Sequence, residues 1–238
     1  MTSSFQDTRW TLVSRSRGSD TQAQAALSEL CEAYYAPVVA FLRRDGREEG
    51  MARDLAHDFF AKLLAGGAID GADPLRGKFR SYLLTALKRF AADQRARDHA
   101  AKRGGGQVHA VIDGEPEQTG AGLQIADTHV DAPDAAFDRQ WALTVLARAM
   151  ARLETAMRED GKAAHFDVLK PWLTAEGDAT PQSDAASRLG MSVEAVKVAV
   201  HRLRKRFREA VKEEIAQTVG QAGDVREELD ALMGALRK

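Results

Sequence analysis

The sequence predicts an all-α protein made of two small helical domains joined by a flexible acidic linker, with a helix-turn-helix in the second domain. Three observations lead to this fold class. Apolar residues recur at helical spacing, alanine is abundant, and few runs of β-branched residues alternate with period two. A stretch without a sustained helical period separates the two helical parts.

Four apolar stripes at helical spacing predict the main helices. A helix with such a stripe must bury it against a neighbour, so we expect the helices to bundle. The stripes are Leu55, Phe59 and Leu63; Phe79, Leu83, Leu87 and Phe90; Phe137, Trp141 and Val145, continued by Met150, Leu153 and Met157; and Val196, Val200, Leu203, Phe207 and Ala210. Pro171 is expected to end or kink a further helix around residues 166–173, and we expect its neighbour Trp172 in the core.

The composition of residues 103–134 predicts a flexible linker. From Gly104 to Pro133 the chain is rich in Gly, Pro, Asp and Glu and contains no Lys or Arg. The acidic residues of this segment are Asp113, Glu115, Glu117, Asp127 and Asp131. The expected domains are therefore residues 1–102 and residues 135–219.

Residues 220–238 predict a tail helix. Its apolar residues at helical spacing are Val225, Leu229, Leu232, Met233 and Leu236. The tail is expected either to cap the second domain or to act as a regulatory or partner-binding helix.

Composition excludes several classes of protein. The 238 residues include 34 basic and 35 acidic side chains, so a nucleic-acid binder of this composition must gather its cations locally. The single cysteine, Cys31, allows no disulfide within the chain, which fits a reducing compartment. No apolar run approaches the roughly 20 residues of a membrane-spanning helix, and residues 1–9 lack the apolar core of a signal peptide. We therefore expect a cytoplasmic protein without a membrane partner.

Residues 183–208 carry the pattern of a helix-turn-helix. Ser183 and Asp184 are expected to cap the free N–H groups at the start of a short first helix. The small buried face of this helix is expected to consist of Ala185, Ala186 and Leu189. Gly190 supplies the positive φ that ends a helix in a tight turn, and Ser192 is expected to cap the second helix.

The second helix of this motif is basic on its outer side. From Ala195 to Arg208 it contains six Lys or Arg and no acidic residue. A helix in the major groove presents its N-terminal residues to base edges and its later cations to phosphates. Apolar Val198 and Ala199 can contact thymine methyl groups. The predicted DNA-contacting residues are Ser192, Lys197, Val198, Ala199, His201, Arg202 and Lys205.

A second basic segment extends from Arg76 to Arg103, with nine cations against two acids. Phe79 and Tyr82 lie among these cations. Cations with nearby aromatic rings suit a single strand, because the cations neutralise phosphates while the rings stack on bases. Phe79 also belongs to an apolar stripe, so packing is the stronger expectation for that residue.

Several segments together resemble an extracytoplasmic-function (ECF) sigma factor of bacterial RNA polymerase, and the likeness covers nearly the whole chain. Residues 10–13 and 26–44 look like the start of the family's region two, and residues 52–64 resemble its polymerase-binding helix. Residues 79–97 resemble the segment that opens and reads the −10 element. Residues 189–208 resemble the region-four helix-turn-helix that reads the −35 element.

The resemblance implies which residues bind which partner. Residues 1–102 would be region two, residues 135–219 would be region four, and the latter's DNA contacts named above would bind the −35 element. The residues implied to bind core polymerase are Asp54, His57, Asp58 and Lys62. The residues implied to bind the −10 element are Arg76, Lys78, Arg80, Tyr82, Lys88, Arg89, Arg95 and Arg97. The acidic linker would thread toward the active cleft of the polymerase.

The implied partners are promoter DNA and core RNA polymerase, with room for an anti-sigma factor or another regulator. No cofactor, metal or enzymatic activity is expected, because the six histidines are scattered without a pair at metal-ligand spacing and no phosphate loop or nucleophile motif occurs. The alternative function is a stand-alone helix-turn-helix regulator that dimerises and never touches polymerase. The second basic segment and the resemblance at residues 52–64 favour the sigma factor.

Overall fold

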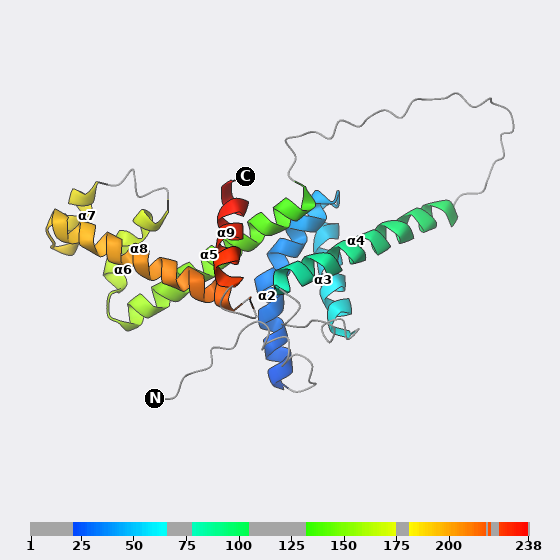
Figure 1. Cartoon of the computed structure of the whole chain (residues 1–238), viewed down its shortest axis with the longest axis horizontal. Coiled ribbons are helices and arrows are strands. Elements are labelled where there is room, and N and C mark those ends of the chain that lie inside the picture. The colour runs from blue at the N-terminus through cyan, green and yellow to red at the C-terminus, as the bar shows by residue number, and fades with distance from the viewer. Residues whose placement is uncertain are drawn as a thin grey trace, which may run out of the picture.

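The described residues of the computed structural model are 21–65, 78–104, 132–174, 181–217, 219 and 224–237. Within them the chain forms eight α-helices, one 3₁₀ helix and no strand (Figure 1), which confirms the predicted all-α class. The elements are α2 (Thr21–Arg44), α3 (Glu49–Ala65), α4 (Phe79–Gly104), α5 (Pro133–Glu159), α6 (Ala163–Leu169), the 3₁₀ helix η3 (Lys170–Leu173), α7 (Gln182–Leu189), α8 (Val193–Ala216) and α9 (Asp224–Arg237). No described helix is long and apolar enough to cross a membrane.

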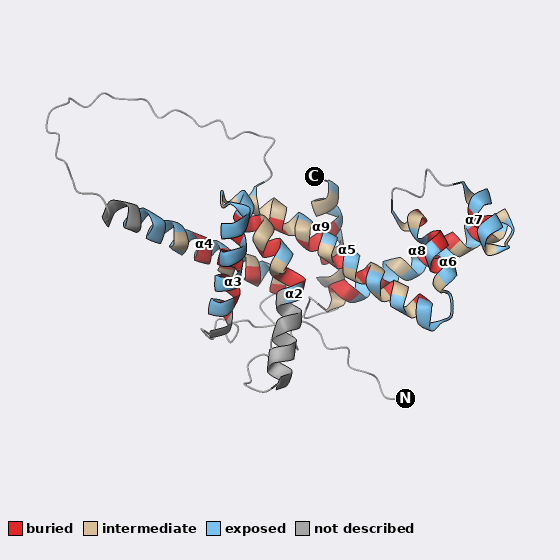
Figure 2. Cartoon of the chain, turned by 180° about the vertical axis from the view of Figure 1, so that it is seen from behind, coloured by how far each residue is buried: buried red, intermediate tan, exposed pale blue. Residues whose placement is uncertain are grey.

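A first hydrophobic cluster joins α2, α3 and α4 to parts of three later helices. The stripes predicted on α3 and α4 are buried in this cluster, as expected. Aromatic rings meet there edge to face, with centroids 5.3 Å apart for Tyr34 and Phe79 and 5.5 Å apart for Phe59 and Phe90. In Figure 2 the buried turns lie where these helices meet.

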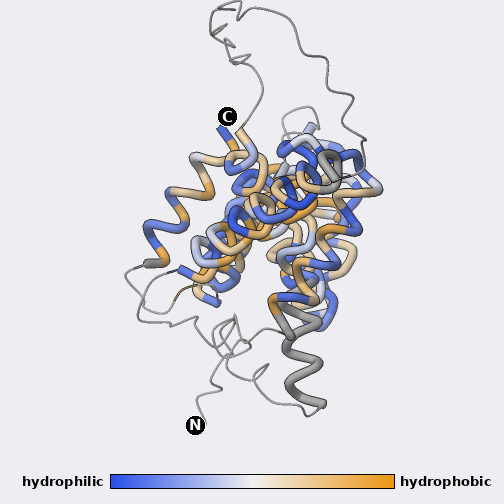
Figure 3. Tube along the Cα trace, turned by 90° about the vertical axis from the view of Figure 1, so that its right-hand side faces the viewer, coloured by the Kyte–Doolittle hydropathy of each residue, from blue (hydrophilic) through white to orange (hydrophobic). Residues whose placement is uncertain are grey.

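A second hydrophobic cluster is built from the end of α5, from α6, η3 and α7, and from the first half of α8. Its buried residues are Leu153, Met157, Phe166, Val168, Leu169, Trp172, Ala185, Ala186, Val196, Val200 and Leu203. Each of these helices turns one apolar stripe inward. Apolar and polar positions also alternate along the helices that face the viewer in Figure 3.

Two long helices belong to both clusters. In the first cluster are Phe137 and Trp141 from the start of α5, together with Val211 and Ile215 from the end of α8. Leu232 of α9 is also buried there. The division into domains at residues 1–102, 135–219 and 220–238 stays a prediction, but contacts between the described helices cross those limits.

Pro171 ends helix α6 as the sequence predicts. The α-helix stops at Leu169, and Lys170–Leu173 continues as a 3₁₀ helix with the proline in its first turn. The change of helix type follows from the missing N–H and the fixed φ of proline. Trp172 is buried in the second cluster, which confirms its expected place in the core.

The turn between α7 and α8 lies where the sequence predicts it. Gly190 ends α7 with φ 62° and ψ 35°, and Met191 N–H donates back to the Ala186 carbonyl at 2.9 Å. Ser192 Oγ then accepts from Ala195 N–H at 3.2 Å and caps α8.

The capping predicted for the start of α7 is wrong. The helix begins at Gln182, its N-cap is Pro181, and no side chain caps it. Ser183 and Asp184 therefore lie inside the first turn, because the helix follows the extended backbone of Pro181 and begins two residues earlier than a cap at Ser183 would place it. Asp184 still suits the positive end of the helix dipole.

Some predictions fall outside the described residues. The linker acids lie in residues 105–131, and Arg76 lies in residues 66–77. Residues 10–13, which open the resemblance, also lie outside the described part of the chain.

Candidate nucleic-acid interface

The outer face of α8 is exposed and cationic. Lys197, His201, Arg202 and Lys205 are all exposed, and we call these four residues the α8 ridge. Val198 lies among them and is 49% exposed. The opposite face of the helix, with its buried valines and leucine, belongs to the second cluster. The two faces predicted for this helix are therefore present.

The charges of the α8 ridge are largely unpaired. Within the described residues no hydrogen bond or ion pair engages the side chains of His201, Arg202 or Lys205, and Lys197 only reaches Glu194 at 4.0 Å. By contrast, Arg204 donates to the Trp172 carbonyl at 3.0 Å, and Arg206 pairs with an aspartate of the turn that follows α5. The ridge therefore offers cations to an external anion, while neighbouring arginines hold α8 in place.

Two further predicted DNA contacts lie at the start of α8. Ser192 is exposed, but its hydroxyl caps the helix. Ala199 packs against the second cluster, so it presents less surface to a partner than Val198 does.

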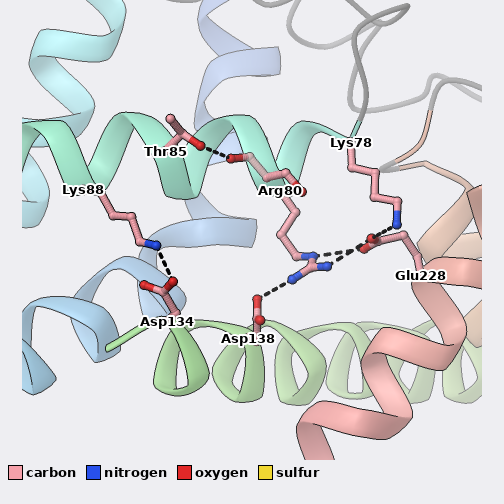
Figure 4. Close-up of polar contacts among 8 residues, drawn as sticks. Lys78, Arg80, Thr85, Lys88, Asp134, Asp138 and Glu228 are labelled. Atoms are coloured by element: carbon pink, nitrogen blue, oxygen red, sulfur yellow. Dashed lines mark hydrogen bonds and ion pairs between the residues drawn. The ribbon is translucent and has the colours of Figure 1, made fainter. Parts of the chain in front are cut away.

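The predicted −10 cations at the start of α4 are paired with carboxylates from α5 and α9 (Figure 4). Arg80 donates from Nε to Glu228 Oε2 at 3.0 Å and from Nη2 to Glu228 Oε1 at 3.1 Å, and it also donates to Asp138. Lys78 Nζ lies 3.0 Å from Glu228 Oε1 and 2.9 Å from Glu227 Oε1. The guanidinium of Arg80 also lies over the Trp141 ring, 4.6 Å from its centroid.

These contacts shift the titration of the groups involved. Burial alone would raise the pKa of Glu228, but hydrogen bonds and charges from Arg80 and Lys78 lower that pKa below its ordinary 4.5. Burial alone would lower the pKa of Lys78 and of Arg80, but their carboxylate partners raise both. All these groups are therefore held in their charged forms near neutral pH.

The other predicted −10 cations lie further along α4 and are more exposed. Lys88 pairs with Asp134 of α5, and Arg95 pairs with Asp45 in the turn after α2. Arg89 and Arg97 are exposed and form no ion pair within the described part of the chain. Tyr82 is half-buried, and burial raises the pKa of its hydroxyl although the charge of Arg89 opposes that shift.

The outer face of α3 carries the residues predicted to bind polymerase. Asp54, His57, Asp58 and Lys62 are all exposed there, while the apolar stripe of the helix is buried. The His57 ring stacks on Tyr35 of α2, with centroids 5.3 Å apart, and Lys62 Nζ lies 3.8 Å from Asp93 of α4. Met51 is 53% exposed one turn before Asp54, so the face combines acids with an apolar side chain.

Sequence reasoning did not identify the carboxylates that meet the α4 cations. Glu227, Glu228 and Asp138 come from helices whose apolar stripes were their only predicted feature. One signal was available: Glu228 lies three residues after Val225 and four before Leu232, on the inward side of α9. A carboxylate on the buried side of a helix requires a cationic partner.

Most of the chain is similar to one known protein family. No curated protein and no solved structure matches the chain. The family described as ECF sigma factor matches residues 12–213, a span that includes α3, the whole of α4 and the α7–α8 turn. The family's members are not enzymes, and their partners are core RNA polymerase and promoter DNA. The chain therefore belongs to the ECF sigma factor family and is an RNA polymerase sigma factor that directs promoter recognition and transcription initiation.

Proposed function

We propose that this sigma factor binds its partners through three separate surfaces. The α8 ridge, with Ser192, Val198 and Ala199 at its start, binds the −35 element. The cations of α4 grip the strand at the −10 element, and the outer face of α3 binds core polymerase.

The observation that carries the proposal is the unpaired charge of the α8 ridge. Arg202 and Lys205 are exposed on a helix that follows a glycine turn and has a free outer face. Cations without internal partners can neutralise phosphates and release counterions, which is the main source of affinity for DNA. Val198, exposed beside them, suits a thymine methyl group.

The outer face of α3 supports a separate protein contact. Its acids are exposed, and the apolar Met51 beside them adds surface that favours burial against a partner. Because this face lies on a helix whose other side is buried, a partner can dock there without disturbing the first cluster.

We further infer that the protein acts in the cytoplasm, where polymerase and promoter DNA are found, and that it has no catalytic activity of its own. An anti-sigma factor or another regulator is compatible with the exposed faces of α3 and α8.

Run-off transcription with purified core polymerase on a genomic library tests the function. Addition of the protein is expected to yield discrete transcripts whose upstream sequences share two elements. A pull-down with core polymerase should recover the protein. Specific DNA binding without recovery by polymerase, and without transcripts, would instead favour the stand-alone regulator.

A further inference from the structure

The start of α4 is covered by α9, a helix that follows the family-matched residues in the sequence. That match ends at residue 213, whereas α9 comprises Asp224–Arg237. Figure 4 shows α9 beside the first turns of α4, with Glu228 directed at the cations there. The side chain of Glu228 is 0% exposed, and it accepts both hydrogen bonds of a bidentate contact with Arg80.

Helix α9 shields two cations from solvent. The side chains of Lys78 and Arg80 are only 16% and 12% exposed. Two positive charges there face three carboxylates, those of Glu227, Glu228 and Asp138. A DNA phosphate approaching this place would meet occupied donors and net negative charge, so it is excluded while α9 stays docked.

Packing alone does not explain the acidic pair. The apolar stripe of α9, with Leu232 buried and Leu229 and Leu236 partly buried, already docks the helix on the first cluster. A buried ion pair is seldom more stabilising than apolar residues of the same size. Glu227 and Glu228 do, however, pair with Lys78 and Arg80, the cations that a DNA strand would need to contact.

The α8 ridge has no such cover. Its cations are exposed and without carboxylate partners from α9 within the described residues. The acids of α9 therefore cover only the start of α4, and they leave α8 accessible to duplex DNA.

We propose that α9 is an autoinhibitory helix whose Glu227 and Glu228 occupy the place of DNA phosphates on Lys78 and Arg80. The inference rests on the proposed role of α4 in binding the −10 strand. The protein then binds duplex DNA through α8 with α9 docked, and it captures a single strand through the start of α4 only when α9 leaves.

The test compares charge-neutral variants of the full chain in binding to labelled single-stranded oligo(dT). The double variant E227Q/E228Q removes both acids from the contact. The matched control E213Q/D230N removes the same charge from exposed positions, one of them on α9 itself. Circular dichroism melting establishes that each variant is folded.

E227Q/E228Q is expected to bind the oligonucleotide several-fold more tightly than the wild type. The slope of log affinity against log salt concentration should also steepen by about 0.7 for each further phosphate that the protein neutralises on a single strand. The control should show neither change. Equal affinity and equal slope for E227Q/E228Q and the wild type would overturn the proposal.

A second variant covers the case in which loss of Glu228 unfolds the protein. Glu227 has a 73% exposed side chain and pairs with Lys78, so E227Q leaves the buried contact between Glu228 and Arg80 intact. E227Q is expected to bind the oligonucleotide up to a few-fold more tightly than the wild type, because loss of the ion pair with Lys78 weakens the docking of α9. Unchanged affinity would overturn the proposal.

Run-off transcription separates this inference from the proposed function. Transcripts from the wild type together with unchanged oligonucleotide binding by E227Q/E228Q would reject the autoinhibition alone. Absence of transcripts with both the wild type and E227Q/E228Q would reject the proposed function, whatever the oligonucleotide shows.

Discussion

At the scale of single residues, the cations of this protein fall into two groups. Arg202 and Lys205 on α8 are exposed and lack partners within the described part of the chain. Lys78 and Arg80 at the start of α4 are mostly covered and engaged by carboxylates. Lysines and arginines of the two groups therefore differ in what they can bind, because a cation that is already paired with a carboxylate cannot readily bind an external anion.

Replacing Arg202 and Lys205 with alanine should weaken binding to duplex DNA of any sequence. Each phosphate that is no longer neutralised lowers the salt slope by about 0.9, since fewer counterions are released. Titration of labelled duplex at several salt concentrations measures the slope. K212A is the control, because Lys212 is exposed on the same helix but pairs with Glu209. Equal slopes for R202A/K205A and K212A would contradict the assignment.

Gly190→Ala should lower the free energy of unfolding by about 1–2 kcal/mol, because a residue with a Cβ is strained at φ +62°. A Cβ at this position meets nothing within 4 Å, so the effect isolates backbone strain. Chemical denaturation measures it. Gly234→Ala is the control: it is helical and equally uncrowded, so it should stabilise the protein by about 0.5–1 kcal/mol instead. The same sign for both variants would refute the strain argument.

At the scale of helices, α3 and α9 place their acidic residues differently relative to a buried apolar stripe. On α3 the stripe packs against α2 and α4, and the acids point outward. On α9 the stripe includes Leu232, but Glu228 lies on the buried side as well. The period of 3.6 residues predicts both helices, whereas the cations that meet Glu228 come from a distant part of the chain.

D54A/D58A should weaken binding to core polymerase without changing stability. An exposed ion pair contributes about 0.2–1 kcal/mol, so loss of two raises the Kd roughly twofold to thirtyfold at moderate salt. Fluorescence titration with labelled core polymerase measures this. E209A, which also removes an exposed acid, serves as the control. An effect of equal size in E209A would remove α3 from the interface.

Docking of α9 should weaken in acid. Because the pKa of Glu228 is lowered in the folded protein, its contact stabilises fully above its ordinary 4.5 and is lost as the pH falls through the lowered value. The groups facing it are Lys78, Arg80, Glu227 and Asp138. Denaturation from pH 7 to pH 3 measures the loss, which should be smaller in E228Q. An identical pH dependence in both proteins would contradict the assignment.

At the scale of the whole molecule, the first cluster joins residues from both ends of the described chain. The start of α5, the end of α8 and α9 all pack on the helices that begin the described part of the protein. Figure 1 shows α5 and α8 running between the two groups of helices. The surfaces that we propose for the −10 and −35 elements are consequently positioned by the same two helices, α5 and α8.

Trp141→Ala should lower the free energy of unfolding by about 3–5 kcal/mol, because it leaves a large cavity in the first cluster. Trp141 is 2% exposed and lies beneath Arg80, so its removal also loosens the contact with α9. Leu143→Ala on the same helix is the control: this side chain is 43% exposed and should change stability by no more than about 0.5 kcal/mol. Similar losses in both variants would contradict the assigned burial.

Much of this protein follows from the sequence alone. The helices, their buried stripes, the end of α6 at Pro171 and the turn at Gly190 depend on neighbours a few residues apart, and local patterns report such neighbours well. The family resemblance rests on the same kind of local motif. The capping predicted at the start of α7 was wrong, because the helix begins directly after Pro181 and Ser183 lies inside its first turn.

Only the tertiary structure decided which charges remain available. Arg80 and Glu228 are separated by 148 positions in the chain, and nothing local to either residue identifies the other as its partner. Their meeting depends on how α5 and α9 pack on the first cluster, which is a property of all the helices together. Short-range spacing therefore determined the helices and the basic segments, whereas long-range packing determined that one basic segment is open and that the start of the other is covered.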